Sequence, residues 1–160
     1  TYRLPEAQLD RFLIKLILTY PSMDEEIEIL NKYIQTATTY ALGQIRPVIQ
    51  PEDIRSIQKD LASVYVEPHI VSYIAQVVNE TRNHTNLYLG ASPRASLAIL
   101  KLAKVIAMMA ERSFVIPDDV QYVAPFVLNH RILLTPEAEM RNITTFDVIS
   151  DILKNVEVPR

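Results

Sequence analysis

Apolar residues recur every three or four positions along most of the chain, and this spacing predicts a mainly α-helical fold. Several of the segments open with proline, which fits the first position of a helix. Helical spacing covers residues 4–10, 23–40, 51–64, 68–78, 93–112, 117–128 and 145–153. We therefore expect a helical bundle, with the polar stretch 79–86 forming a helix end and a loop.

Capping residues mark two of the predicted helix starts. Ser22 and Glu25 have the spacing of a capping box, in which each side chain bonds the backbone N–H of the other residue. Thr144 and Asp147 have the same spacing ahead of the last helix. Gly43 indicates where the helix that follows Ser22 ends, near Tyr40.

The helix over residues 93–112 is predicted to lie at the centre of the core. Ser92 is suited to its N-cap and Pro93 to its first helical position. The segment is apolar nearly all round, with one polar strip. That strip contains Arg94, Lys101, Lys104 and Glu111.

Two segments do not have helical spacing. The run Phe12–Leu18 is apolar throughout, and periodicity alone does not separate a short buried strand from a piece of helix. Its length and the following Pro21 favour a strand. Residues 133–142 are rich in charge and predict a loop.

Composition narrows the class of protein. Of 160 residues, 49% are apolar and only two are glycine, which excludes a disordered or collagen-like chain. The absence of cysteine excludes disulfides and thiolate metal sites, and favours a reducing compartment. The net charge of −3 argues against a nucleic-acid-binding surface. The most apolar stretch, Ala95–Ala110, is interrupted by Lys101 and Lys104, so no membrane span is expected.

No phosphate-binding loop is present, because such a loop needs glycines followed by lysine. The only glycines, Gly43 and Gly90, precede glutamine and alanine. The pair Asp118–Asp119 follows a short apolar run, as an acidic magnesium-binding pair would. The preceding proline favours a helix start instead, where carboxylates complement the helix dipole.

The histidines do not have the spacing of a metal site. His69, His84 and His130 are far apart in the sequence, and each is expected at the surface or at a helix end.

Two arginines occupy positions of possible chemical interest. Arg94 falls in the first turn of a helix, where free backbone N–H groups and the helix dipole favour an anion. Position alone favours a solvent-facing arginine, or one that caps a local carboxylate, over a phosphate site. Arg11 follows Asp10, and by position it is a surface ion pair of small energetic value.

Three stretches resemble motifs of the MoxR-type AAA+ ATPases. Residues 4–12 (LPEAQLDRF) resemble the stretch that follows sensor 1, and residues 89–95 (LGASPRA) resemble the sensor 2 motif. Residues 116–131 are similar to the helix after sensor 2. The order and spacing agree over essentially the whole chain. The ATPase subunits of magnesium chelatase are close relatives and share the resemblance.

The resemblance implies two domains. Residues 1–21 would be the last segment of the α/β nucleotide-binding subdomain, with Phe12–Leu18 as its final strand. Residues 22–160 would be the C-terminal helical lid. The chain does not begin with Met, so it is expected to be a piece of a longer protein, with the Walker A, Walker B and sensor 1 residues before Thr1. Without its sheet, the strand is expected to swap onto a second copy or to be remodelled.

The resemblance also implies roles for particular residues. Arg11 matches the arginine finger, which would act in trans on the γ-phosphate held by a neighbouring subunit. Arg94 matches sensor 2 and would touch the γ-phosphate of its own subunit, next to Ser92 and Pro93. The full-length protein would use ATP and Mg²⁺, whereas this chain alone is expected to bind no cofactor and to have no ATPase activity.

The implied biology is a chaperone-like role in complex assembly or metal insertion, in the cytoplasm. The full-length protein would form a ring, expected to be a hexamer, and could act with a von Willebrand factor A-domain protein. One alternative remains open, a stand-alone helical module that docks a protein partner and never meets ATP. A third hypothesis, a DNA-binding helical domain, is disfavoured by the acidic balance.

Overall fold

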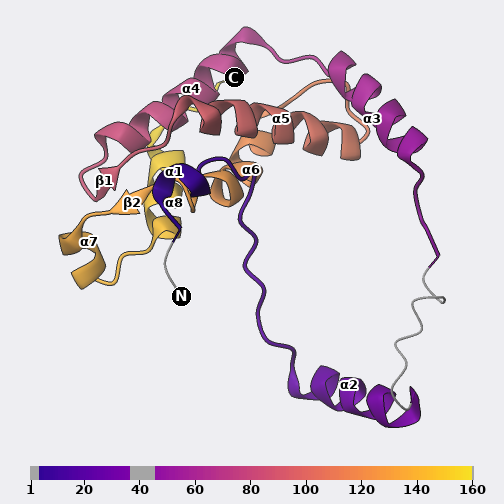
Figure 1. Cartoon of the computed structure of the whole chain (residues 1–160). Helices are drawn as coiled ribbons and strands as arrows, with labels where there is room; N and C mark the ends of the chain where they lie inside the picture. The colour runs from indigo at the N-terminus through magenta and orange to yellow at the C-terminus, as the bar shows by residue number, and fades with distance from the viewer. Residues whose placement is uncertain (1–3, 37–45, 160) are drawn as a thin grey trace. The chain divides into compact units, whose positions relative to one another are not determined.

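The computed structural model describes residues 4–36 and 46–159 (Figure 1). These residues group into two compact units. The larger unit contains residues 4–16 and 59–159, and the smaller contains the described residues of the range 17–58. Each unit is treated separately below.

The larger unit is a bundle of helices with a small sheet. Its helices are α1 (Glu6–Leu9), α4 (Pro68–Asn83), α5 (Pro93–Met109), α6 (Pro117–Leu128), α7 (Pro136–Met140) and α8 (Thr145–Asn155). Its strands are β1 (Leu87–Leu89) and β2 (Leu133–Leu134), which pair antiparallel. The mainly α-helical class predicted from the spacing is confirmed.

The central position predicted for α5 is confirmed as well. This helix packs against α4 on one side and α6 on the other, while α8 contacts both α4 and α6. Four of the five buried residues of α5 are alanines, which allow neighbouring helices to come close. The buried residues of α5 are Ala95, Ala98, Ile99, Ala103 and Ala107.

The predicted caps form with the expected geometry. Thr144 and Asp147 make a reciprocal box at α8, with the Thr144 backbone N–H donating to the Asp147 carboxylate at 2.8 Å. The Ser92 hydroxyl accepts from the backbone N–H of Arg94, and Pro93 occupies the first helical position of α5. Local side-chain chemistry therefore fixes where these helices begin.

The predicted strand Phe12–Leu18 is not formed. The segment has no regular secondary structure, although the Lys15 N–H donates to the Phe126 carbonyl at 3.0 Å. A strand requires hydrogen-bonding partners on a neighbouring strand. Within residues 4–36 and 46–159, no strand lies beside this segment to supply them.

The predicted charged loop over residues 133–142 is also wrong, because it contains β2 and α7. A two-residue strand gives no periodicity, and it forms here only because β1 pairs with it. The stretch 79–86, predicted as a helix end and a loop, contains the end of α4 at Asn83 and the loop 84–86. Val71 is one of the apolar positions of the predicted helix 68–78, but it is 49% exposed.

The smaller unit contains α2 (Met23–Thr36) and the start of α3 (Pro51–Ser63). The capping box predicted at Ser22 is present, since its backbone N–H donates to the Glu25 carboxylate at 2.7 Å. The predicted continuation of α2 to Tyr40 and its end at Gly43 lie outside the described residues. Across the described ranges, no helix is long and apolar enough to cross a bilayer.

Candidate functional site

The first turn of α5 is positioned by the last turn of α4. The Thr81 hydroxyl accepts a hydrogen bond from the Ala91 N–H at 2.9 Å, and the Arg82 Nε donates to the Ala91 carbonyl at 3.0 Å. Thr81 is fully buried. These bonds fix the residue just before the N-cap, and therefore the direction in which α5 starts.

Gly90 is required by a close approach of two backbones. A Cβ built at this position would lie 2.6 Å from the Thr81 carbonyl oxygen and 2.7 Å from the Arg82 Cα. Such distances are well inside van der Waals contact, and both neighbouring atoms are backbone. Any larger residue would push the β1–α5 connection away from α4.

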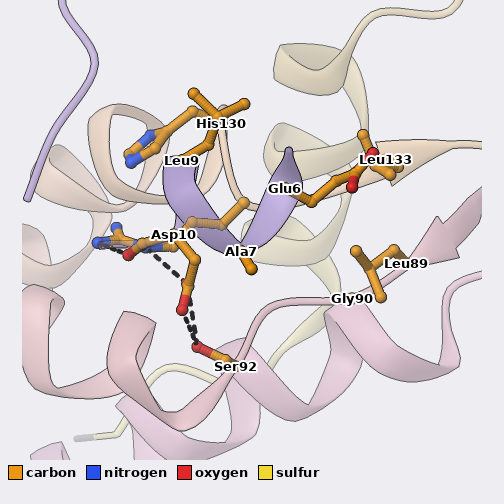
Figure 2. Close-up of a pocket in the computed structure, with 10 residues that line it drawn as sticks. Glu6, Ala7, Leu9, Asp10, Leu89, Gly90, Ser92, His130 and Leu133 are labelled. Atoms are coloured by element: carbon orange, nitrogen blue, oxygen red, sulfur yellow. Dashed lines mark hydrogen bonds and ion pairs between the residues drawn. The ribbon is translucent and has the colours of Figure 1, made fainter. Parts of the chain in front are cut away.

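Asp10, at the end of α1, reaches the start of α5 (Figure 2). The Ser92 hydroxyl lies 3.0 Å from both oxygens of its carboxylate. The Arg94 Nη1 donates to the Oδ2 atom of Asp10 at 3.3 Å. The Arg94 side chain is nevertheless 57% exposed, so this guanidinium is accessible while it pairs with an anion.

Arg131 approaches the same carboxylate from the end of α6. Its Nε lies 3.2 Å from the Oδ1 atom of Asp10, and its side chain is only 1% exposed. The guanidinium also donates to backbone carbonyls of Asp10, Phe12, Leu13 and Val127. Burial lowers the pKa of Arg131, and the Asp10 carboxylate opposes that shift. The buried charge is satisfied by hydrogen bonds on all sides, as a stable buried arginine requires.

His130 supports the same turn. Its Nε2 lies 3.0 Å from the Phe12 carbonyl and its Nδ1 lies 3.2 Å from the Asn129 side-chain oxygen. Burial lowers the pKa of His130, with smaller opposing and reinforcing effects from neighbouring groups. His130 lies at a helix end, as expected, directly after the C-cap of α6, and it also bonds a segment 118 residues away.

Arg11 lies in the turn that Arg131 and His130 hold. The residue is exposed, and its guanidinium carbon lies 5.1 Å from the centroid of the Phe12 ring. Among the described residues it forms no ion pair, because Asp10 pairs with Arg94 and Arg131 instead. The predicted surface pair between Arg11 and Asp10 is absent.

A pocket of about 290 Å³ lies beside this cluster. Its walls combine apolar side chains with Asp10 and Ser92, which are labelled in Figure 2, and with Arg131. The other lining residues are Glu6, Ala7, Leu9, Leu89, Gly90, His130 and Leu133. The pocket therefore joins α1, the β1–α5 connection and the end of α6.

The other candidate groups have structural roles. Asp119 accepts a hydrogen bond from the Ile116 N–H at 2.9 Å and pairs with Arg112 at 2.6 Å, which supports the interpretation of Asp118–Asp119 as a helix start. His84 lies 3.2 Å from the Asp151 carboxylate. Within the described part of the chain, no group of three or more acidic residues, histidines or cysteines is placed to hold a metal.

The cluster can bind an anion at its exposed side. The Arg94 guanidinium and the Ser92 hydroxyl both donate to the Asp10 carboxylate, so an anionic group already lies at this point. Of the four residues predicted for the site, Arg94, Ser92 and Pro93 lie together, while Arg11 lies on the neighbouring turn. The predicted site did not include Asp10, Arg131 and His130, because their partners are remote in the sequence.

Comparisons with known proteins show what this chain is similar to. Residues 79–152 match the AAA lid domain family. The chain is 42% identical over 159 residues to the Bacillus subtilis protein YeaC, which is named as uncharacterized, covering 99% of this chain and 49% of that protein. It is 38% identical over 168 residues to the chaperone MoxR1 of Mycobacterium tuberculosis, covering 99% and 43%.

A solved structure has the same fold. The crystal structure of a proposed ATPase from Cytophaga hutchinsonii superposes with a TM-score of 0.87 at 32% identity, covering 99% of this chain and 50% of that one. The chain therefore spans about half the length of the proteins it matches.

Proposed function

Given that this chain belongs to the MoxR-like AAA+ proteins and carries their lid domain, we propose that it supplies two arginines for ATP hydrolysis in a longer protein. Arg94 acts as sensor 2 on the γ-phosphate of its own subunit. Arg11 acts as an arginine finger on the nucleotide of a neighbour. The Walker elements belong to sequence before residue 1, and this chain alone does not hydrolyse ATP.

The observation that carries the proposal is that Arg94 is both accessible to solvent and paired with an anion. Its side chain is mostly exposed, yet it already pairs with a carboxylate at the start of α5. A phosphate oxygen has the same charge and hydrogen-bonding needs as that carboxylate. Arg94 with the cap formed by Ser92 and Pro93 therefore suits a phosphate arriving at the first turn of α5.

Magnesium does not fit the described residues in the same way, because they contain no acidic cluster that would hold it. A Mg²⁺ ion bound with ATP would neutralise charge on the phosphates, and its ligands would come from the Walker elements. What this chain contributes is positive charge and orientation. Arg94 binds phosphate, and the turn around Arg11 presents a second guanidinium outward.

The function in the cell is inferred from relatives. The Mycobacterium tuberculosis relative is named a chaperone. We extend this to a chaperone-like role in complex assembly or metal insertion, in a cytoplasmic hexameric ring that works with a von Willebrand factor A-domain partner. A finger that acts in trans requires a neighbouring subunit, and a ring supplies one at every site.

A complementation experiment in the full-length protein tests the action in trans. Arg11→Ala subunits are expected to bind nucleotide but to hydrolyse it slowly, since a finger contributes on the order of 10³–10⁵ in rate. Mixing them with subunits that keep Arg11 but lack a working phosphate loop is expected to restore turnover. No restoration would argue against a finger in trans. Arg55→Ala, on exposed α3, is a matched control.

The second candidate function is a protein-docking module without nucleotide. It is favoured by the exposed apolar face of α2, where Ile27, Leu30 and Ile34 are 46%, 58% and 75% exposed. The reading frame upstream of Thr1 separates the two functions. A glycine-rich loop ending in Lys-Ser or Lys-Thr supports the ATPase, and a start codon immediately before Thr1 supports the docking module.

A further inference from the structure

The Asp10 carboxylate connects two arginines that have different surroundings. It lies 3.3 Å from the Arg94 Nη1 and 3.2 Å from the Arg131 Nε. Arg94 comes from the start of α5 and Arg131 from the end of α6. In the described part of the chain, no other acidic side chain pairs with two arginines.

Arg131 fixes the backbone on both sides of Arg11. Its guanidinium donates to the carbonyls of Asp10 and Leu13 at 3.2 Å, and to that of Phe12. His130 also contacts the Phe12 carbonyl. The direction in which Arg11 leaves the turn therefore depends on how Arg131 is oriented.

Arg94 is the partner of Asp10 that is able to leave. It is held by one hydrogen bond at 3.3 Å and is 57% exposed, whereas Arg131 is buried and held by several bonds. A phosphate group with more negative charge than a carboxylate competes with Asp10 for Arg94. When Arg94 moves to that phosphate, Asp10 keeps only Ser92 and Arg131 as charged or polar partners.

We infer that Asp10 is a positioning residue that couples Arg94 to Arg11 within one chain. When Arg94 exchanges Asp10 for a phosphate, the charge balance on Arg131 changes, and with it the turn that presents Arg11. The state of one subunit's own nucleotide site thereby affects the finger it offers to its neighbour. The inference rests on the proposed function, and it adds a connection between two residues that the proposal treats separately.

A double-mutant cycle measured in trans tests the coupling. The acceptor subunits are full-length Arg11→Ala protein, so the turnover of the mixture depends on fingers from the donor. The donors lack a working phosphate loop and therefore contribute only Arg11. Four donors are compared: one with no further change, Arg94→Ala, Asp10→Asn, and the Arg94→Ala/Asp10→Asn double variant.

The coupling predicts that Arg94→Ala in the donor changes the ATP turnover of the mixture by at least about threefold. It also predicts that Arg94→Ala has no such effect when the donor carries Asp10→Asn. The same effect of Arg94→Ala in both backgrounds would overturn it, as would no effect in either. The control is a second cycle in which the donor carries Asp118→Asn in place of Asp10→Asn. Asp118 is an exposed aspartate at the start of α6, so this substitution should leave the effect of Arg94→Ala on turnover unchanged.

The design separates failure of the coupling from failure of the proposed function. If the unmodified donor restores no activity, the finger itself is refuted, and the coupling with it. If the unmodified donor restores turnover but Arg94→Ala has the same effect with and without Asp10→Asn, only the coupling is refuted.

If the Asp10→Asn donor does not melt cooperatively and is therefore not folded, a second variant replaces it in the test. Arg131→Lys keeps the charge but replaces the planar five-donor group with a single ammonium. In the same cycle it is expected to remove the dependence on Arg94. Persistence of that dependence in a folded Arg131→Lys donor would contradict the inference.

Discussion

Arg94 at the start of α5 and Arg131 at the end of α6 bind the same carboxylate, but their surroundings are opposite. Arg131 is 1% exposed and bonds several backbone carbonyls, whereas Arg94 is 57% exposed and has one weak bond to Asp10. A buried guanidinium with every partner supplied by the chain holds structure. An exposed guanidinium with one replaceable partner is suited to a ligand. The difference is set by burial and not by residue type.

The largest effect is expected from removing the buried arginine. Arg131→Met removes one donor from the Asp10 carboxylate and the guanidinium donor of the Asp10, Phe12 and Leu13 carbonyls. Breaking such a buried pair costs about 3–5 kcal/mol. Urea denaturation of the chain should show this loss in the free energy of unfolding. Arg55→Met, on exposed α3, should change it by less than about 0.5 kcal/mol. If both substitutions lowered the free energy of unfolding equally, the structural role of the buried Arg131 would be contradicted.

A backbone shift at the start of α5 should cause the next largest loss in the free energy of unfolding. Gly90→Ala places a methyl group 2.6 Å from the Thr81 carbonyl, so the β1–α5 connection must move. Overpacking of this kind costs about 1–3 kcal/mol. The same denaturation experiment measures it, and an unchanged midpoint would show that the close approach is not a constraint.

The cap of α5 should contribute less. Ser92→Ala removes an N-cap, which typically costs about 1 kcal/mol, and also the hydroxyl that bonds Asp10. Thr144→Ala at α8 is the matched control, because it removes a cap without touching Asp10. Both variants should lose similar stability, but limited proteolysis should cut residues 4–16 faster only in Ser92→Ala. Equal cleavage would mean that Ser92 does not help to hold α1.

The smallest stability effect is expected from pH. Because burial lowers the folded-state pKa of His130, the unfolded chain binds its proton more readily. Stability should therefore fall as pH drops below about 6.5, the usual pKa of histidine, and the loss should continue down through the lowered folded-state value. His130→Gln should flatten this part of the pH profile, measured by thermal melting, and exposed His69→Gln should not. A steeper profile in His130→Gln would contradict the assignment.

Features that depend on neighbours in sequence were predictable. The capping boxes at Ser22 and Thr144 and the cap at Ser92 involve residues two or three positions apart, so the pattern determines them. The buried stripe of α5 follows from its spacing in the same way. The resemblance to MoxR-type proteins added Arg94 and Arg11 as candidates, whereas position alone favoured ordinary surface arginines.

Features that depend on distant partners were not predictable. Asp10 and Arg131 are separated by 121 residues, and nothing near either residue indicates the pairing. β2 forms because β1 lies beside it, and Phe12–Leu18 stays irregular because the described chain offers it no strand. In each case the outcome is decided by tertiary contact and not by local preference.

ATP turnover of the full-length protein carrying Arg94→Ala tests the central claim most directly, namely that the exposed arginine serves a ligand and not the fold. The account predicts that turnover falls on the order of 10²-fold, as when one donor to a developing negative charge is removed. It also predicts that the melting temperature is nearly unchanged, because an exposed ion pair contributes about 0–1 kcal/mol. Unchanged turnover, or a loss of turnover that follows a loss of fold, would contradict it.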